Sequence, residues 1–191
     1  YRYIEPYKII KELTLVKKYF KTDKICFFDE VFSEPVDYAK ELLVKIIKSK
    51  VKIRFEICDN PACIDEEYVY LLKRAGCSGI MLSADACSEA MLKSLKKGFT
   101  LKEVQKAAEL FSKYNIPYFL TLLLGAPGEN KKTIMEGFDF IKKLPGTSAV
   151  LLNYGLRIQS KTGIYKYCKD KCLLNEQGLL KPLFYLSKRI K

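Results

Sequence analysis

Apolar residues form one long run near the middle of the chain, from Tyr118 to Leu124, interrupted only by Thr121. A strand with one solvated face would alternate, so this run predicts a strand covered on both faces, as in a parallel sheet flanked by helices. A glycine turn from Gly125 to Glu129 follows it, and residues 131–144 then carry a helical pattern. These segments form a strand–turn–helix unit, and folds built from such units bind ligands at the carboxyl ends of their strands.

The same unit recurs along the chain. Predicted strands begin near residues 24, 51, 79, 117 and 149, with a helical pattern between each pair. Asp65 is a predicted helix N-cap and Gly76 a predicted C-cap. No Gly-x-Gly-x-x-Gly follows a predicted strand, which argues against a dinucleotide-binding sheet. The pattern therefore predicts an α/β fold, a partial TIM-like (β/α) barrel with about five parallel strands and flanking helices.

Length and composition set bounds on this picture. The chain has 191 residues, 49% of them hydrophobic, which is enough to bury the core of one domain. No apolar run approaches the roughly 20 residues that span a bilayer, so no membrane partner is expected. The net charge is +12. Because the lysines are scattered along helical stretches, solvated helix faces are favoured over a nucleic-acid patch, which stays the alternative.

Histidine is absent, and the sequence holds seven cysteines. The missing histidine removes the usual general base and the usual metal ligand. An odd number of cysteines, several in apolar context, predicts reduced thiols and a cytoplasmic protein. Cys168 and Cys172 are four residues apart and so lie on one face of a helix. Two thiolates fall short of a four-ligand site, so we assign no metal site.

The candidate chemistry lies at the predicted strand ends, namely at Asp29 and Glu30, Asp59 and Asn60, Asp85, Gly125 to Glu129, and Arg157. Carboxylates there can hold an ammonium group or accept hydrogen bonds from a ribose diol. Glycine lets the backbone approach a flat ring, and arginine can fork onto a carboxylate. Together these groups match an aminoacyl-like nucleoside. The alternative is that they are turn and cap formers, with Asp85 capping a helix that begins near Ser88.

Several motifs resemble those of the radical S-adenosylmethionine (SAM) superfamily, in the branch whose members often carry a cobalamin-binding domain. They are Phe-Phe-Asp-Glu-Val-Phe (27–32), Asn-Pro (60–61), Asp-Glu-Glu (65–67), Leu-Lys-Arg-Ala-Gly-Cys (72–77), Ser-Glu-Ala-Met-Leu-Lys-Ser-Leu-Lys-Lys-Gly-Phe-Thr (88–100) and Leu-Leu-Gly-Ala-Pro-Gly-Glu (123–129). The resemblance implies a partial (β/α)6 barrel that holds SAM beside a [4Fe–4S] cluster. Reductive cleavage of SAM then yields a 5′-deoxyadenosyl radical, which abstracts hydrogen from a substrate, and the family includes methyltransferases and oxidoreductases.

The resemblance also assigns roles by position. Asp29 and Glu30 match the motif that contacts the methionine amino group, and Asp85 matches the acidic position that receives the ribose hydroxyls. Gly125, with Ala126 and Pro127, matches the motif near the adenine. Arg157 matches an arginine at the end of the sixth strand, for which the resemblance gives no firm role.

One family motif has no counterpart here. The cluster-binding Cys-x-x-x-Cys-x-x-Cys is absent, and the family places it just upstream of a stretch like 1–6. We therefore expect a piece of a longer enzyme that lacks the first of six strands and is inactive alone. Residues 1–172 would form the barrel domain and 173–191 a helical extension. The longer protein would use SAM, a [4Fe–4S] cluster and cobalamin on an upstream domain, with flavodoxin or ferredoxin as reductant. This piece would self-associate through an open strand edge.

Two alternatives from other classes remain open. One is a degenerate barrel that never binds a cluster and acts as a binding or assembly domain. The other is an aldolase-like barrel that forms a Schiff base on a lysine. Lys24 and Lys52 sit at strand starts, the wrong end of a barrel for catalysis, which argues against the aldolase.

Overall fold

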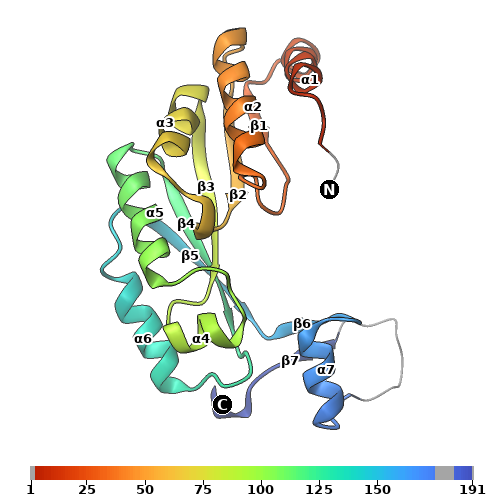
Figure 1. Ribbon diagram of the computed structural model, residues 1–191, viewed down its shortest axis with the longest axis vertical. Helices are drawn as coiled ribbons and strands as arrows, with labels where there is room; N and C mark the ends of the chain where they lie inside the picture. Colours follow the sequence, from red (N-terminus) through yellow and green to blue (C-terminus); the bar gives the residue numbers. More distant parts are fainter. Residues whose placement is uncertain (1–2, 175–182, 191) are drawn as a thin grey trace. The chain divides into compact units, whose positions relative to one another are not determined.

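The computed structural model describes residues 3–174 and 183–190, in which helices alternate with strands (Figure 1). The helices are α1 (Pro6–Phe20), α2 (Val36–Ser49), α3 (Glu66–Ala75), α4 (Glu89–Ser94), α5 (Leu101–Lys113), α6 (Lys131–Ile141) and α7 (Gly163–Asp170), with 3-10 turns η1 (Pro61–Cys63) and η2 (Lys188–Ile190). The strands are β1 (Lys24–Cys26), β2 (Arg54–Asp59), β3 (Cys77–Asp85), β4 (Tyr118–Leu124), β5 (Thr147–Tyr154), β6 (Leu156–Ile158) and β7 (Leu183–Tyr185). No helix among these described residues is both long and apolar enough to cross a bilayer.

Five strands form one sheet in the order β1-β2-β3-β4-β5. β1 pairs parallel with β2, with Lys24 opposite Arg54, and β2 pairs parallel with β3, with Ile57 opposite Ile80. A helix connects each strand to the next, as parallel pairing requires. The predicted α/β class, a partial barrel of about five parallel strands flanked by helices, is confirmed.

The described chain divides into two compact units, and each is taken by itself below. The first unit contains residues 1–84, 102–120 and 144–150. The second contains residues 85–101, 121–143 and 151–191.

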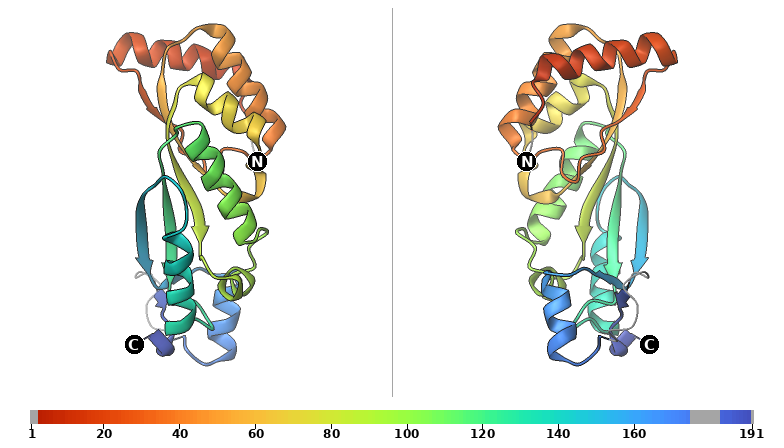
Figure 2. Two further views of the ribbon diagram at one scale, coloured as in Figure 1. Left: turned by 90° about the vertical axis from the view of Figure 1, so that its left-hand side faces the viewer. Right: turned by 90° about the vertical axis from the view of Figure 1, so that its right-hand side faces the viewer.

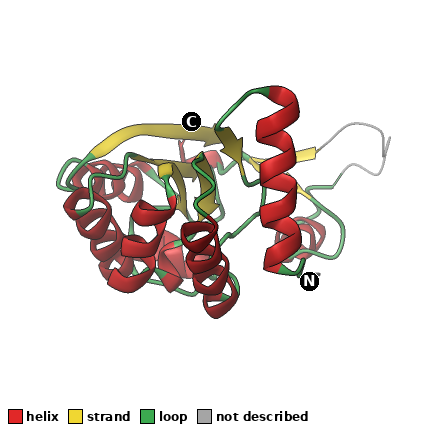
Figure 3. Cartoon of the chain, turned by 90° about the horizontal axis from the view of Figure 1, so that it is seen from above, coloured by secondary structure: helices red, strands yellow, loops and turns green. Residues whose placement is uncertain are grey.

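In the first unit, α2 and α3 lie on the same face of β2 and β3 (Figure 2, Figure 3). Residues of the two strands that are buried alternate with residues that are less buried, as a sheet covered by helices on one face requires. Phe55 and Tyr68 are both fully buried. Both ends of α3 are capped by local contacts. The Asp65 carboxylate accepts the Tyr68 N–H at 2.7 Å at the start of the helix, and Gly76 ends it with φ 102°.

The burial of β4 is less complete than its sequence predicts. Tyr118, Leu120, Leu122 and Leu124 are buried, whereas Phe119 and Leu123 between them are partly exposed. One face of the strand is therefore fully covered and the other only in part. The prediction of cover on both faces is therefore confirmed for one face and only in part for the other, on which Thr121 is buried.

The strand predicted to begin near residue 24 is short and ends at Cys26. The Phe27 N–H still donates to the Glu56 carbonyl at 3.0 Å, and the chain then leaves the sheet. Phe28 is 98% exposed. The loop that follows returns to β2 when the Phe32 N–H donates to the Cys58 carbonyl at 2.9 Å.

The end of the chain differs most from the prediction. The expected helical extension falls partly on residues 175–182 and 191, which lie outside the described residues. Leu183–Tyr185 form β7, which pairs antiparallel with β6, so the helix is wrong for these residues. Beyond β7, the Ser187 N–H donates to the Gly125 carbonyl at 2.8 Å. This described part of the tail therefore packs within the second unit, while a domain boundary near residue 172 stays a prediction.

Candidate functional site

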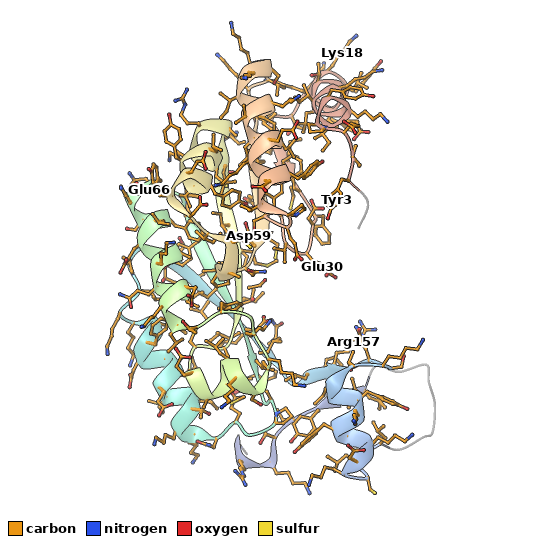
Figure 4. The ribbon with its side chains drawn as sticks, in the orientation of Figure 1. Tyr3, Lys18, Glu30, Asp59, Glu66 and Arg157 are labelled. Carbon is orange, nitrogen blue, oxygen red and sulfur yellow. The ribbon has the colours of Figure 1, made fainter. Side chains whose placement is uncertain are left out.

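Asp29 and Glu30 lie in the first unit, in the loop between β1 and α2, and both side chains are exposed. Figure 4 labels Glu30. Neither forms an ion pair or a side-chain hydrogen bond with the described residues. They border a hollow of about 890 Å³ whose walls include Phe28, Met81 and Phe119. Two unpaired carboxylates beside an open, largely apolar hollow are suited to hold a cationic group of a ligand.

Asp59, also in the first unit, is placed quite differently. The sequence marks it as a strand-end turn residue or ligand group, but its side chain is fully buried at the end of β2. Its carboxylate accepts hydrogen bonds from the Ser33 hydroxyl (2.5 Å), the Tyr68 hydroxyl (2.7 Å) and the Asn60 N–H (2.9 Å). Burial raises the pKa of Asp59, and the bonds from Ser33 and Tyr68 oppose that rise. A carboxylate enclosed in this way cannot contact a ligand directly.

Asp85 lies in the second unit, as the last residue of β3, with a left-handed backbone (φ 60°). Its carboxylate forms an ion pair with the Lys97 ammonium, and the Thr121 hydroxyl donates to it at 3.4 Å. The Asp85 side chain is 19% exposed, so solvent still reaches it. Lys97 is a partner that the sequence analysis missed, because no local spacing links the two residues.

Asp85 does not cap α4, which was the alternative role for it. The N-cap of this helix is Ser88, and its hydroxyl makes no cap bond. The Ser88 oxygen is buried without a hydrogen-bond partner among the described residues. The Asp85 carboxylate therefore contacts Lys97 and Thr121 and does not cap α4.

The turn after β4 is held by its own glutamate. Gly125 has φ 99°, and its N–H donates to the Glu129 carboxylate, which is 3% exposed. Burial raises the pKa of Glu129, and the N–H groups of Gly125 and Ala126 oppose the rise. The Ser187 hydroxyl adds a bond to the Glu129 carbonyl at 3.1 Å, and the Ser94 hydroxyl one to the Pro127 carbonyl at 2.7 Å. The backbone of this turn is fixed before any ligand arrives.

Arg157 is not at the end of the last strand of the large sheet, as the sequence predicted. That strand, β5, ends at Tyr154, and Gly155 turns the chain with φ 78°. Arg157 then lies within β6, opposite Phe184 of β7, with its side chain exposed (Figure 4). It borders an open hollow of about 430 Å³ together with Tyr154 and Phe184. An exposed guanidinium beside two aromatic rings is suited to an anionic or planar group.

The cysteine pair does not form a metal site in the described residues. Cys168 is fully buried on α7, whereas Cys172 lies beyond the helix end at Asp170, with φ 51° and an exposed side chain. The two therefore do not share a helix face. No group of three or more histidine, cysteine, aspartate or glutamate residues in the described chain is placed to bind a metal ion.

Comparison with known proteins defines the class. The family model of the radical SAM superfamily matches residues 1–141. This chain therefore belongs to the radical SAM superfamily. Within the described residues, the alternation of strands and helices agrees with this family.

Individual relatives are distant. Tryptophan 2-C-methyltransferase of Streptomyces laurentii is 25% identical over 158 residues, covering 75% of this chain and 26% of the relative. A tRNA-2-methylthio-N(6)-dimethylallyladenosine synthase of Clostridioides difficile is 24% identical over 155 residues, covering 77% of this chain and 30% of the relative. The chain thus spans less than a third of the length of these relatives.

Solved structures agree on the fold. The radical SAM methyltransferase TsrM from Kitasatospora setae, with cobalamin and a [4Fe–4S] cluster bound, superposes with a TM-score of 0.80 at 22% identity. That match covers 88% of this chain and 32% of TsrM. The cobalamin-dependent SAM radical enzyme OxsB with aqua-cobalamin bound gives 0.58 at 19% identity, over 90% of this chain and 25% of OxsB.

Proposed function

We propose that this chain forms the SAM-binding part of a radical SAM enzyme. The end of β3 carries the proposal. Asp85 keeps a strained left-handed backbone, and residues held in such conformations cluster at ligand sites. Its carboxylate accepts from Lys97 and Thr121, and two oxygens with about four lone-pair sites still have room for two ribose hydroxyls.

The other candidate residues carry chemistry suited to other groups of SAM, in the first unit and in the second unit separately. Asp29 and Glu30 are exposed carboxylates suited to the methionine ammonium group. The fixed turn of Gly125, Ala126 and Pro127 offers backbone to the adenine, because a rigid edge binds a flat ring without an ordering cost. Arg157 is suited to a carboxylate, which a guanidinium binds with two parallel hydrogen bonds.

The cofactors of the whole enzyme extend beyond these residues. When bound, SAM would supply either a methyl group or, after one-electron reduction by the cluster of the longer protein, a 5′-deoxyadenosyl radical for hydrogen abstraction. The described residues do not fit a [4Fe–4S] cluster, because none of their cysteines belongs to a group of three possible ligands. We therefore assign the cluster ligands, cobalamin binding and contact with a flavodoxin or ferredoxin reductant to a longer protein. For this longer protein we infer a cytoplasmic enzyme that catalyses methyl transfer or oxidation. The methyltransferases among the relatives support methyl transfer.

Binding of isotopically labelled SAM by equilibrium dialysis tests the proposal. Asp85→Asn keeps the side-chain shape and removes the charge, so we expect SAM affinity to fall about 10- to 100-fold. Asp139→Asn is the matched control, because Asp139 is 59% exposed on α6 of the same unit and pairs only with Lys142 among the described residues. Equal SAM affinity in the two variants would remove Asp85 from the site and contradict the proposal.

A further inference from the structure

We propose that Asp59 is a positioning residue that fixes the acidic loop, residues 27–35, and thereby the placement of Asp29 and Glu30. It acts through the chain of side chains Tyr68–Asp59–Ser33. The consequence for SAM binding rests on the proposed function, whereas the fixing of the loop does not. All of these residues belong to the first unit.

The acidic loop is tied to β2 at both of its ends. At its start, the Phe27 N–H donates to the Glu56 carbonyl at 3.0 Å. Near its end, the Phe32 N–H donates to the Cys58 carbonyl at 2.9 Å. Between these ties, Phe28, Asp29 and Glu30 are exposed. Their placement therefore depends on how firmly the two ends are held.

The second tie is reinforced by the buried carboxylate. Ser33 and Asp59 are both 0% exposed, and the Ser33 hydroxyl donates to Asp59 Oδ1 at 2.5 Å. The backbone N–H of Ser33 also bonds the Asp59 carboxylate, so Asp59 holds the loop end through both groups of Ser33. A hydrogen bond to a charged acceptor is about twice as strong as a neutral one. Asp59 therefore holds the loop more firmly than a backbone tie alone.

Asp59 is itself held from the other side by α3. The Tyr68 hydroxyl donates to Asp59 Oδ2 at 2.7 Å, and the side chain of Tyr68 is 0% exposed. The start of α3 is fixed in turn, because Asp65 caps it and pairs with Lys40 of α2 at 2.8 Å. The carboxylate is thus a rigid link between a capped helix and the loop. Burial of the Asp59 carboxylate costs free energy unless hydrogen bonds compensate it. The bonds from Ser33 and Tyr68 compensate it, so the role of this carboxylate is to hold the loop and α3 together.

Hydrogen exchange of this 191-residue chain tests the link without any cofactor. Ser33→Ala removes the hydroxyl bond from the loop and keeps the backbone one, and Tyr68→Phe removes the hydroxyl bond from α3. Tyr118→Phe is the matched control: Tyr118 is 1% exposed in the same unit, and its hydroxyl bonds the Pro145 carbonyl at 2.8 Å. We expect amides of residues 27–34 to exchange about tenfold faster in the first two variants and unchanged in the control.

Two outcomes of that experiment overturn the inference. One is loop exchange in Ser33→Ala and Tyr68→Phe that equals the wild type. The other is acceleration by the same factor throughout the first unit, which would make Asp59 a general stabilising group. The mild Ser33→Ala change keeps the test valid even if Tyr68→Phe folds poorly.

SAM affinity measured on the same variants connects the link to the ligand. If the loop is correctly placed for only a tenth of the time, the apparent Kd rises about tenfold. We therefore expect a rise of about three- to tenfold for Ser33→Ala and Tyr68→Phe, and at least as much for Asp29→Asn and Glu30→Gln. If the last two variants leave affinity unchanged, the proposed function fails while the exchange result stands. If only the last two weaken binding, the positioning inference fails.

Discussion

Asp85 and Lys97 form an ion pair at the end of β3, where Asp85 has a left-handed backbone (φ 60°). A side chain in this region costs roughly 1–2 kcal/mol per residue, less for aspartate and asparagine and least for glycine. The chain thus keeps a carboxylate at a position where glycine would be easier to fold. This conflict between local preference and retained chemistry is expected of a ligand site.

Substitution at Asp85 measures that cost. We expect Asp85→Ala to be less stable than Asp85→Gly by about 1 kcal/mol, because both lose the Lys97 pair but only alanine keeps a Cβ at positive φ. Urea denaturation of the two variants gives the difference directly. An alanine variant as stable as the glycine variant would show that the backbone carries no strain at this residue.

Glu129 gives a prediction for pH. Its pKa is raised by burial above the ordinary value of 4.5, so the folded chain binds this proton more tightly than the unfolded chain. The contribution of Glu129 to stability is therefore fully present below about pH 4.5, is lost as pH rises through the folded pKa, and does not change further above it. Glu129→Gln should remove that part of the fall, as measured by urea denaturation between pH 4 and 8. The control is Glu136→Gln, since Glu136 is 48% exposed on α6 of the same unit. A fall as steep in Glu129→Gln as in the control would contradict the prediction.

Two glycines make a matched pair for stability. A Cβ added to Gly76 (φ 102°) would lie 2.2 Å from the Ile53 carbonyl oxygen, whereas one added to Gly98 meets nothing within 4 Å. Gly76→Ala should therefore cost at least about 2 kcal/mol, from backbone strain and the clash. Gly98→Ala should stay within about 0.5 kcal/mol. Thermal melting ranks the two, and equal melting temperatures would mean that the close approach at Gly76 relaxes freely.

Much of the fold was predictable because its signals are local. Asp65 and Gly76 bound α3 as their capping chemistry indicates, and α2 (Val36–Ser49) lies where a helical pattern was predicted between the first two strands. The β6–β7 pair was not predicted, because each strand has only three residues and therefore shows no usable alternation. Short strands gain their stability from pairing distant in sequence, which a local pattern does not record.

The site was predictable only in part, for the same reason. Strand-end acids are visible in the sequence, so Asp29, Asp59 and Asp85 were all candidates. Their different surroundings were not visible in the sequence, since the buried Asp59 accepts a hydrogen bond from Ser33, which is 26 residues away. The partner of Asp85, Lys97, is 12 residues away on the far side of the short helix α4, so no helical spacing connects the two residues.

The edge of the sheet predicts self-association. β1 is the end strand of the described sheet, pairs only with β2 there, and is followed by the 98% exposed Phe28. Open strand edges and exposed aromatic side chains favour pairing with another chain. Sedimentation velocity under reducing conditions should show association that increases with concentration and weakens in Ile25→Lys. A monomer over a wide concentration range would contradict this prediction.

The central claim is that this chain carries the SAM site, and chemical-shift mapping tests it most directly. The ¹⁵N-labelled chain is titrated with SAM to millimolar concentration, because a site without cluster ligands should bind weakly. The account predicts saturable shifts at the amides of Asp29, Glu30, Asp85, Gly125 and Ala126, with the shifts near Asp85 lost first in Asp85→Asn. Saturable shifts confined to residues outside this set, or no saturable shift at any concentration reached, would contradict it.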